Sequence, residues 1–208
     1  MINASEVVSA SKIRLQEKQI IAAGRSNQVL ELIVHSGVIR ASGSFNLENS
    51  DVTLALFSSG HTIVIKVPSG CMLQLEAITE SLLTVKPDST ASPTEDLNRW
   101  LIKLHLVRQL IGAEARLIAL FQLLVEDFGF RHKDNYSLPF WLSHARLAEI
   151  ISTSRGTVTR QVTYLRKSMD IGVSEDQGSL IISSRLMEVT PNQLEAKISG
   201  SSFRQTYY

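Results

Sequence analysis

The chain has 208 residues, of which 44% are hydrophobic and 20% charged, and its formal net charge is +1 at pH 7. These values are typical of globular domains and exclude an intrinsically disordered chain or a collagen-like repeat. The single cysteine, Cys71, excludes an intrachain disulfide and any metal site made of four cysteines. No signal-peptide pattern opens the sequence and no apolar run reaches the roughly 18 residues of a membrane span, so we expect a cytoplasmic protein without a membrane partner.

Between residues 19 and 86, short apolar runs are separated by Gly, Ser, Asn and Pro. Runs rich in Val, Ile and Leu with turn residues at roughly ten-residue spacing are typical of a β-sandwich or β-roll. Turns are predicted at 58–60 and 68–70, and Gly37 is predicted to separate two strands. The sequence therefore predicts an N-terminal β-domain, which we place at residues 1–91.

Residues 86–94 have the composition of a linker that ends at a helix start. Ser92 is the predicted N-cap, Pro93 suits the first helical position, and Glu95 stands where a capping-box carboxylate would bond back. The apolar spacing then changes to about 3.6, at Leu97, Trp100, Leu104, Val107 and Ile111. This stripe predicts a helix over 92–112 that pairs with its copy in a second subunit, and the alternative is that it packs against its own β-domain.

A third segment, residues 113–208, begins with a helix predicted over 113–128. A polar loop is predicted at 129–138 and two further helices at 144–151 and 154–168. An alternating stretch after residue 171 predicts a β-hairpin that turns at 176–178. Residues 129–208 hold ten basic and seven acidic residues, so the positive charge of the protein lies in this part.

Residues 142–165 have the spacing of a helix-turn-helix. Ser143 is the predicted N-cap of the first helix, and Ala148 is small enough for a second helix to cross closely. After a turn at 152–154, the second helix is predicted to bury Val158, Val162 and Leu165. Together with the following hairpin, these helices predict a winged helix.

The opposite face of the second helix has the chemistry of a DNA-reading surface. Arginine can bond two guanine atoms, threonine can bond a base or offer its methyl group to thymine, and glycine keeps the surface low. The residues expected at the bases are Arg155, Gly156, Thr159 and Arg160. The residues expected at phosphates are Ser143, His144, Ser154, Thr157 and Lys167. Taken alone, two exposed arginines would also be compatible with an ordinary solvated surface.

From about residue 93 to 187 the sequence resembles the CRP/FNR family of bacterial transcription regulators. The resemblance lies in the apolar helix stripe, VEDFG at 125–129, LSHARLAEIISTSRGTVTRQVTYLRK at 142–167, and the wing. The order Arg-x-Thr-Val-Thr-Arg is most similar to that of the nitrogen-control regulators of cyanobacteria, and the β-domain is similar in outline and shortened. The resemblance implies an α+β fold with a β-roll, a long dimerisation helix and a C-terminal winged helix-turn-helix. It also implies a homodimer on a palindromic double-stranded DNA operator, with RNA polymerase as a further partner.

Departures from the family pattern concern the effector and one turn. Cyclic-nucleotide members carry Gly-Glu-Leu and Arg-Ser-Ala segments, which are missing after Gly60, where Lys66 is the candidate cation, so control by cyclic AMP is not expected. Arg40 and Arg108 are the candidate arginines for 2-oxoglutarate, and the effector stays unknown. Ser152 stands where the family's turn usually has glycine, at a cost of about 1 kcal/mol if its backbone is left-handed.

Neither a cofactor nor an enzyme activity is expected. His61 and Cys71 are single residues without a haem-ligand pattern. The five histidines lack metal-ligand spacing, and nucleophile-elbow, zinc-protease and phosphate-loop motifs do not occur. The alternative to a DNA-binding regulator is a ligand-sensing or protein-interaction module whose winged helix docks a partner protein.

Overall fold

The computed structural model describes residues 11–45, 51–92, 94–174 and 179–190. The chain divides into two compact units, Met1–Ile102 and Lys103–Tyr208. The division falls within one helix, so the segment 92–112 predicted as a separate dimerisation helix is shared between the units. Among the described residues, no helix is long and apolar enough to cross a membrane.

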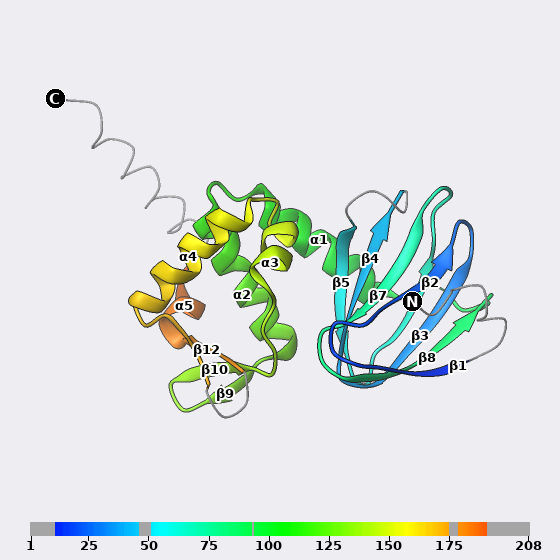
Figure 1. Ribbon diagram of the computed structural model, residues 1–208, viewed down its shortest axis with the longest axis horizontal. Coiled ribbons are helices and arrows are strands. Elements are labelled where there is room, and N and C mark those ends of the chain that lie inside the picture. Colours follow the sequence, from blue (N-terminus) through cyan, green and yellow to red (C-terminus); the bar gives the residue numbers. More distant parts are fainter. Residues whose placement is uncertain (1–10, 46–50, 93, 175–178, 191–208) are drawn as a thin grey trace. The chain divides into compact units, whose positions relative to one another are not determined.

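The described residues of the first unit form eight antiparallel strands in two four-stranded sheets (Figure 1). One sheet has the order β1-β8-β3-β6 and the other β2-β7-β4-β5. The strands are β1 (Ser11–Leu15), β2 (Ile20–Arg25), β3 (Val29–Ser36), β4 (Val38–Ser44), β5 (Val52–Ser58), β6 (Thr62–Lys66), β7 (Met72–Ala77) and β8 (Ser81–Pro87). Alternate residues of β3 and β8 are buried, as period-two patterning requires of strands with one face on a core. The strands predicted for this part of the chain are confirmed.

Glycines form the turns that the sequence predicted. Gly37 joins β3 to β4 with φ +81°, and Gly60 and Gly70 also have positive φ. At Gly37 a Cβ atom would collide with the carbonyl oxygen of Glu80. The position therefore needs glycine for space as well as for backbone conformation.

Arg40 of β4 is fully buried in a polar cluster inside the first unit. Its Nη1 donates to Oδ2 of Asp51 at 2.6 Å and to Oε2 of Glu76 at 3.0 Å. Its Nε donates to Oγ1 of Thr53 at 2.6 Å. A buried guanidinium needs such partners because its desolvation costs several kcal/mol, and here two carboxylates from β7 and from the residue before β5 supply them.

The second unit contains most of the helices and one four-stranded sheet, with the order β11-β12-β10-β9. Its elements are α2 (Ala113–Phe128), β9 (Phe130–His132), β10 (Asn135–Leu138), α3 (His144–Ile150), α4 (Arg155–Lys167), β11 (Ile171–Val173), β12 (Leu180–Ser183) and α5 (Ser184–Glu188). The hairpin of β11 and β12 confirms the predicted wing, whereas its turn at 176–178 lies outside the described residues. The prediction of a loop over 129–138 is wrong, because β10 pairs with β12, from Asn135 with Ser183 to Leu138 with Leu180.

The helix α1 (Glu95–Gln109) is shorter than the predicted 92–112. It begins at Glu95, so Glu95 is the first helical residue rather than the third, and Ser92 lies before the helix. Pro93 lies outside the described residues. Two carboxylates, Glu95 and Asp96, therefore occupy the first turn, where the helix dipole favours negative charge.

The apolar stripe of α1 is largely covered in the single chain. Trp100, Leu104 and Val107 are 2%, 1% and 7% exposed, whereas Leu97 is half-buried and Ile111, beyond the helix, is exposed. These three side chains are therefore buried in the single chain. The exposed apolar side chains of α1 lie on another face, with Ile102 at 61% and Leu106 at 60%.

Candidate nucleic-acid interface

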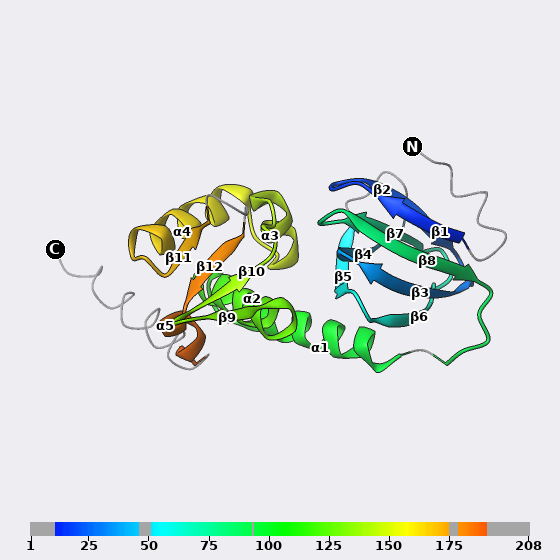
Figure 2. The same cartoon turned by 90° about the horizontal axis from the view of Figure 1, so that it is seen from below.

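The helices α3 and α4 pack side by side, as Figure 2 shows. Ser143 caps α3, because its side chain accepts a hydrogen bond from the backbone N–H of Arg146 at 3.2 Å. Leu147 and Ala148 are buried at 0% and 4% exposure. The predicted N-cap and the small residue at the helix crossing are therefore confirmed.

The turn between the two helices contains a left-handed non-glycine residue. Ser152 has φ +52°. Its N–H donates to the carbonyl of Glu149 at 3.2 Å, and the N–H of Thr153 donates to the carbonyl of Ala148 at 2.9 Å. This pair of bonds is a Schellman motif, whose left-handed position is usually glycine. The strain expected at Ser152 from the sequence is therefore present.

We expect Ser152→Gly to raise the free energy of unfolding by about 0.5–1 kcal/mol, because glycine removes the left-handed penalty but gains freedom in the unfolded chain. Urea denaturation followed by circular dichroism measures the change. Ser154→Ala serves as the opposite control, since loss of the cap of α4 should lower stability by about 1 kcal/mol. A lower free energy of unfolding for Ser152→Gly than for the unchanged protein would show that the left-handed backbone at Ser152 is not strained.

The helix α4 buries one face and exposes the other. Ser154 caps it by accepting from the N–H of Thr157 at 3.1 Å. The inward residues are those predicted, and each is at most 2% exposed: Val158, Val162 and Leu165. The residues exposed on the other side include Arg155, Gly156, Thr159, Arg160 and Lys167. A Cβ atom at Gly156 would meet only Oγ of Ser154, at 3.9 Å, so nothing among the described residues demands glycine there.

The exposed face of α4 is positively charged. Arg155, Arg160, Arg166 and Lys167 are all exposed, and none of them forms an ion pair within the part of the chain that the structure describes. Their charges are therefore available to phosphates and bases. Arg166 lies over the ring of Trp141, with 5.5 Å from Cζ to the ring centroid.

His144, in the first turn of α3, contacts the middle of α4. Its Nδ1 lies 3.0 Å from Oγ1 of Thr159, and its ring meets Trp141 edge-on at 6.0 Å. Burial lowers the pKa of the His144 imidazole, and the positive charges of Arg166 and Arg155 lower it further. The ring is consequently neutral at pH 7, which is unfavourable for the phosphate contact predicted from the sequence.

Asp170 connects the end of α4 to the wing. It accepts from Nη2 of Arg185 at 2.7 Å and from Oγ of Ser168 at 2.5 Å. Its carbonyl accepts from the N–H of Ser183 in β12 at 2.9 Å. Burial by itself would raise the pKa of Asp170, but the hydrogen bonds from Ser168 and Arg185 and the charge of Arg185 lower it on balance. The ionised carboxylate thus joins the end of α4 to β12 and α5.

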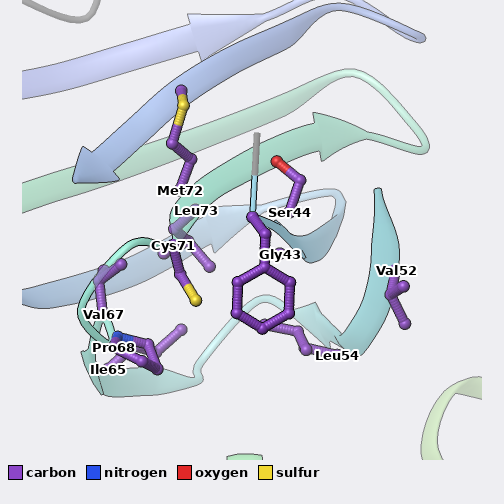
Figure 3. Close-up of a pocket in the computed structure, with 11 residues that line it drawn as sticks. Gly43, Ser44, Val52, Leu54, Ile65, Val67, Pro68, Cys71, Met72 and Leu73 are labelled. Atoms are coloured by element: carbon purple, nitrogen blue, oxygen red, sulfur yellow. The ribbon is translucent and has the colours of Figure 1, made fainter. Parts of the chain in front are cut away.

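The first unit contains a separate apolar cavity of about 550 Å³ (Figure 3). Its walls come from the ends of β4 and β6, the start of β5, and residues 67–73, and include Ile65, Pro68 and Cys71. None of the described lining residues is charged. Ser44 adds a buried hydroxyl that has no hydrogen-bond partner among the described residues. A cyclic phosphate or a dicarboxylate would therefore find no cation among these lining residues.

The two arginines considered for 2-oxoglutarate are engaged elsewhere. Arg40 is bonded within the cluster of Asp51, Glu76 and Thr53. Arg108 donates from Nε to the carbonyl of Ile150 at 2.8 Å, at the end of α3. Neither of them lines the cavity. Among the residues that the structure describes, no group of three or more His, Cys, Asp or Glu could hold a metal ion.

Sequence reasoning missed two contacts that position this interface. Arg116 of α2 donates to the carbonyl of Leu110 at 2.8 Å and lies 3.4 Å from the carbonyls of Ile151 and Ser152 in the turn. The second contact is the one between His144 and Thr159, two residues that were each predicted to contact DNA and that here contact each other. Their spacing of fifteen residues follows no helical or strand period, so only the crossing of α3 and α4 brings them together.

No protein-family model matches the sequence, and no curated protein matches it. Solved structures match most of the chain. A CooA variant from Carboxydothermus hydrogenoformans is 17% identical, with a TM-score of 0.63 over 89% of this chain and 88% of that one. FixK2 from Bradyrhizobium japonicum is 16% identical, with a TM-score of 0.63 over 86% and 96% of the two chains.

A transcriptional regulator of the CRP/FNR family from Thermus thermophilus is 17% identical, with a TM-score of 0.58 over 86% of this chain and 99% of that one. The present chain therefore has the fold of these regulators: a β-roll, a helix and a C-terminal winged helix-turn-helix. The fold class predicted from the sequence is confirmed.

Proposed function

We propose that the protein is a transcription regulator of CRP/FNR type that binds a palindromic double-stranded DNA operator as a homodimer. The observation that carries this proposal is the exposed face of α4, where Arg155 and Arg160 have no ion-pair partner among the described residues. A helix of this kind, preceded by a capped helix and followed by a hairpin, fits the major groove. The likeness of the fold to transcriptional regulators supports the proposal.

The contacts follow from the chemistry of each side chain. Base edges are assigned to Arg155, Gly156, Thr159 and Arg160. Phosphates are assigned to Ser143, Ser154, Thr157 and Lys167, at the starts of α3 and α4 and the end of α4. RNA polymerase is the further partner that regulation of transcription requires. For His144, the neutral ring and its bond to Thr159 favour a positioning role over a phosphate contact.

The absence of a cation among the described residues of the cavity walls supports a protein that is not controlled by cyclic AMP. The same walls favour the binding of an apolar molecule over 2-oxoglutarate, because a buried carboxylate without a partner is costly. A ligand of this cavity would therefore differ in chemistry from a nucleotide.

Selection of bound duplexes from a random library tests the function. We expect a palindromic consensus with half-sites about 10 base pairs apart, and affinity that falls steeply between about 50 and 200 mM salt as counterions are released. The alternative, a winged helix that docks a partner protein, predicts no enriched duplex and a weaker response to salt. Absence of any enriched sequence would refute the proposed function.

The pairing of two subunits is assigned to the exposed apolar face of α1. Ile102 and Leu106 are one helical turn apart and therefore lie next to each other on the same face. Pairing of this face with its copy would cover four large apolar side chains, each contributing about 1.5–3 kcal/mol when fully buried. These two residues replace Trp100, Leu104 and Val107 in the predicted interface.

We expect the double variant Ile102→Glu, Leu106→Glu to weaken dimerisation by about 100-fold or more, because pairing would bury four unpaired carboxylates. Sedimentation equilibrium measures the dissociation constant. Phe130→Glu, at an equally exposed apolar position outside α1, serves as the matched control. A dimer of unchanged strength in the double variant would place the interface elsewhere.

A further inference from the structure

Thr159 is an exposed residue of α4 whose hydroxyl group is already used inside the protein. Its Oγ1 donates to the carbonyl oxygen of Arg155, one turn earlier in the helix, at 2.9 Å. A hydroxyl group has one hydrogen, so Thr159 has none left for a base. It therefore cannot donate a hydrogen bond to the acceptor atoms of the major groove, such as O4 of thymine and N7 of the purines.

The same oxygen is held from the side by His144. Because the hydrogen of Thr159 points to Arg155, the contact of 3.0 Å requires Nδ1 of His144 to be the donor. Burial and the nearby arginines lower the pKa of this imidazole, which favours the neutral ring, and the donor role toward Thr159 places its single proton on Nδ1. The ring also meets Trp141 edge-on. Two hydrogen bonds from two helices therefore fix one rotamer of the Thr159 side chain.

Once the hydroxyl is held, its hydrogen and one of its two lone pairs are used, and the methyl group is the apolar surface that Thr159 offers to DNA. In helices a threonine that bonds the carbonyl four residues earlier has a defined χ1 angle, and its methyl occupies the other substituent position on Cβ. Apolar contact with the C5-methyl group is how such a side chain recognises thymine. The absence of a side chain at Gly156 leaves room for close approach of the helix to the bases.

We propose that Thr159 reads the methyl group of one thymine in each half-site, and that His144 is the positioning residue that holds Thr159 in this orientation. The proposal rests on the proposed function, since it presupposes specific DNA binding. It assigns a thymine at one position of the half-site.

Replacement of thymine by deoxyuridine tests the proposal, because the two bases differ only in the methyl group. Each thymine of the selected operator is replaced in turn, and affinity is measured by fluorescence anisotropy. We expect one position per half-site at which deoxyuridine weakens binding by about 3- to 5-fold, the value of one buried methyl group.

Two matched variants then separate the methyl from the hydroxyl. Thr159→Ser keeps both hydrogen bonds and loses the methyl, so the ratio of thymine to deoxyuridine affinity should fall to about one at that position. Thr159→Val keeps a methyl and loses the hydroxyl, so the ratio should persist even where overall affinity falls. For the positioning role, His144→Ala should reduce the ratio, and His144→Asn should retain it because its amide can donate to the same oxygen.

The outcomes distinguish the inference from the function on which it rests. If the wild-type protein selects no duplex, the proposed function fails. If it selects an operator but no thymine shows a deoxyuridine effect, or if the effect survives in Thr159→Ser, the inference about Thr159 is overturned. If the ratio is unchanged in His144→Ala, the positioning role of His144 is overturned.

Discussion

Replacement of Arg40 by alanine is expected to lower the free energy of unfolding by about 3–5 kcal/mol. The guanidinium is fully buried and pairs with Asp51 and Glu76, whose side chains are 24% and 13% exposed. Its loss removes a charged partner from two largely buried carboxylates, and their desolvation is then less well compensated. Thr53 loses its bond to Nε in the same variant.

Lys86→Ala provides a matched control for this experiment. Lys86 also pairs with a carboxylate, Glu31, at 2.8 Å, but its side chain is 40% exposed. An exposed pair of this kind contributes at most about 1 kcal/mol. Urea denaturation should therefore separate the two variants clearly. Equal and small losses for both would show that the Arg40 cluster is not a stabilising feature of the β-roll.

The second large effect concerns DNA recognition by α4. We expect Arg160→Ala to weaken binding to the selected operator by about 1–3 kcal/mol. On a duplex in which the base pair contacted by Arg160 is substituted, the same variant should weaken binding much less. The reason is that a bidentate contact is made only with the matching base. The guanidinium of Arg160 lies 3.4 Å from Oγ1 of Thr157, a weak contact that leaves the side chain available for such a base.

Lys167→Ala is the corresponding control for a phosphate contact. Because phosphates are the same in every sequence, this variant should weaken matched and mismatched duplexes alike and reduce the slope of log affinity against log salt by about 1. Titrations of both variants on matched and singly substituted duplexes measure the difference. If Arg160→Ala weakens binding to matched and substituted duplexes equally, Arg160 does not contact a base.

Local patterns were sufficient for much of the fold and for the exposed face of α4. The caps Ser143 and Ser154 act on backbone N–H groups within three residues, so their role is visible in the sequence. The inward face of α4 follows from its 3.6-residue period, and the strands of the β-roll follow from alternation. The turn at Ser152 was placed from the sequence, whereas its left-handed backbone is seen only in the structure.

Pairing between distant segments was not visible in the same way. All residues of β9 are exposed, so no apolar pattern marks this strand, and β10 is a strand because it bonds to β12 over forty residues later. Both the stripe at Trp100 and the face at Ile102 of α1 are apolar. A helical period shows that a face is apolar, but packing decides which face the rest of the chain covers.

The sequence by itself determined the helix-turn-helix, its caps and the exposed face of α4, because these depend on interactions within a few residues along the chain. Only the tertiary structure decided that Arg40 belongs to a buried cluster, that Ile102 and Leu106 stay exposed, and that His144 holds Thr159. In each of these cases the outcome depends on another strand or helix. Side-chain chemistry states what a residue can bond, whereas the packing of distant elements determines which partner it meets.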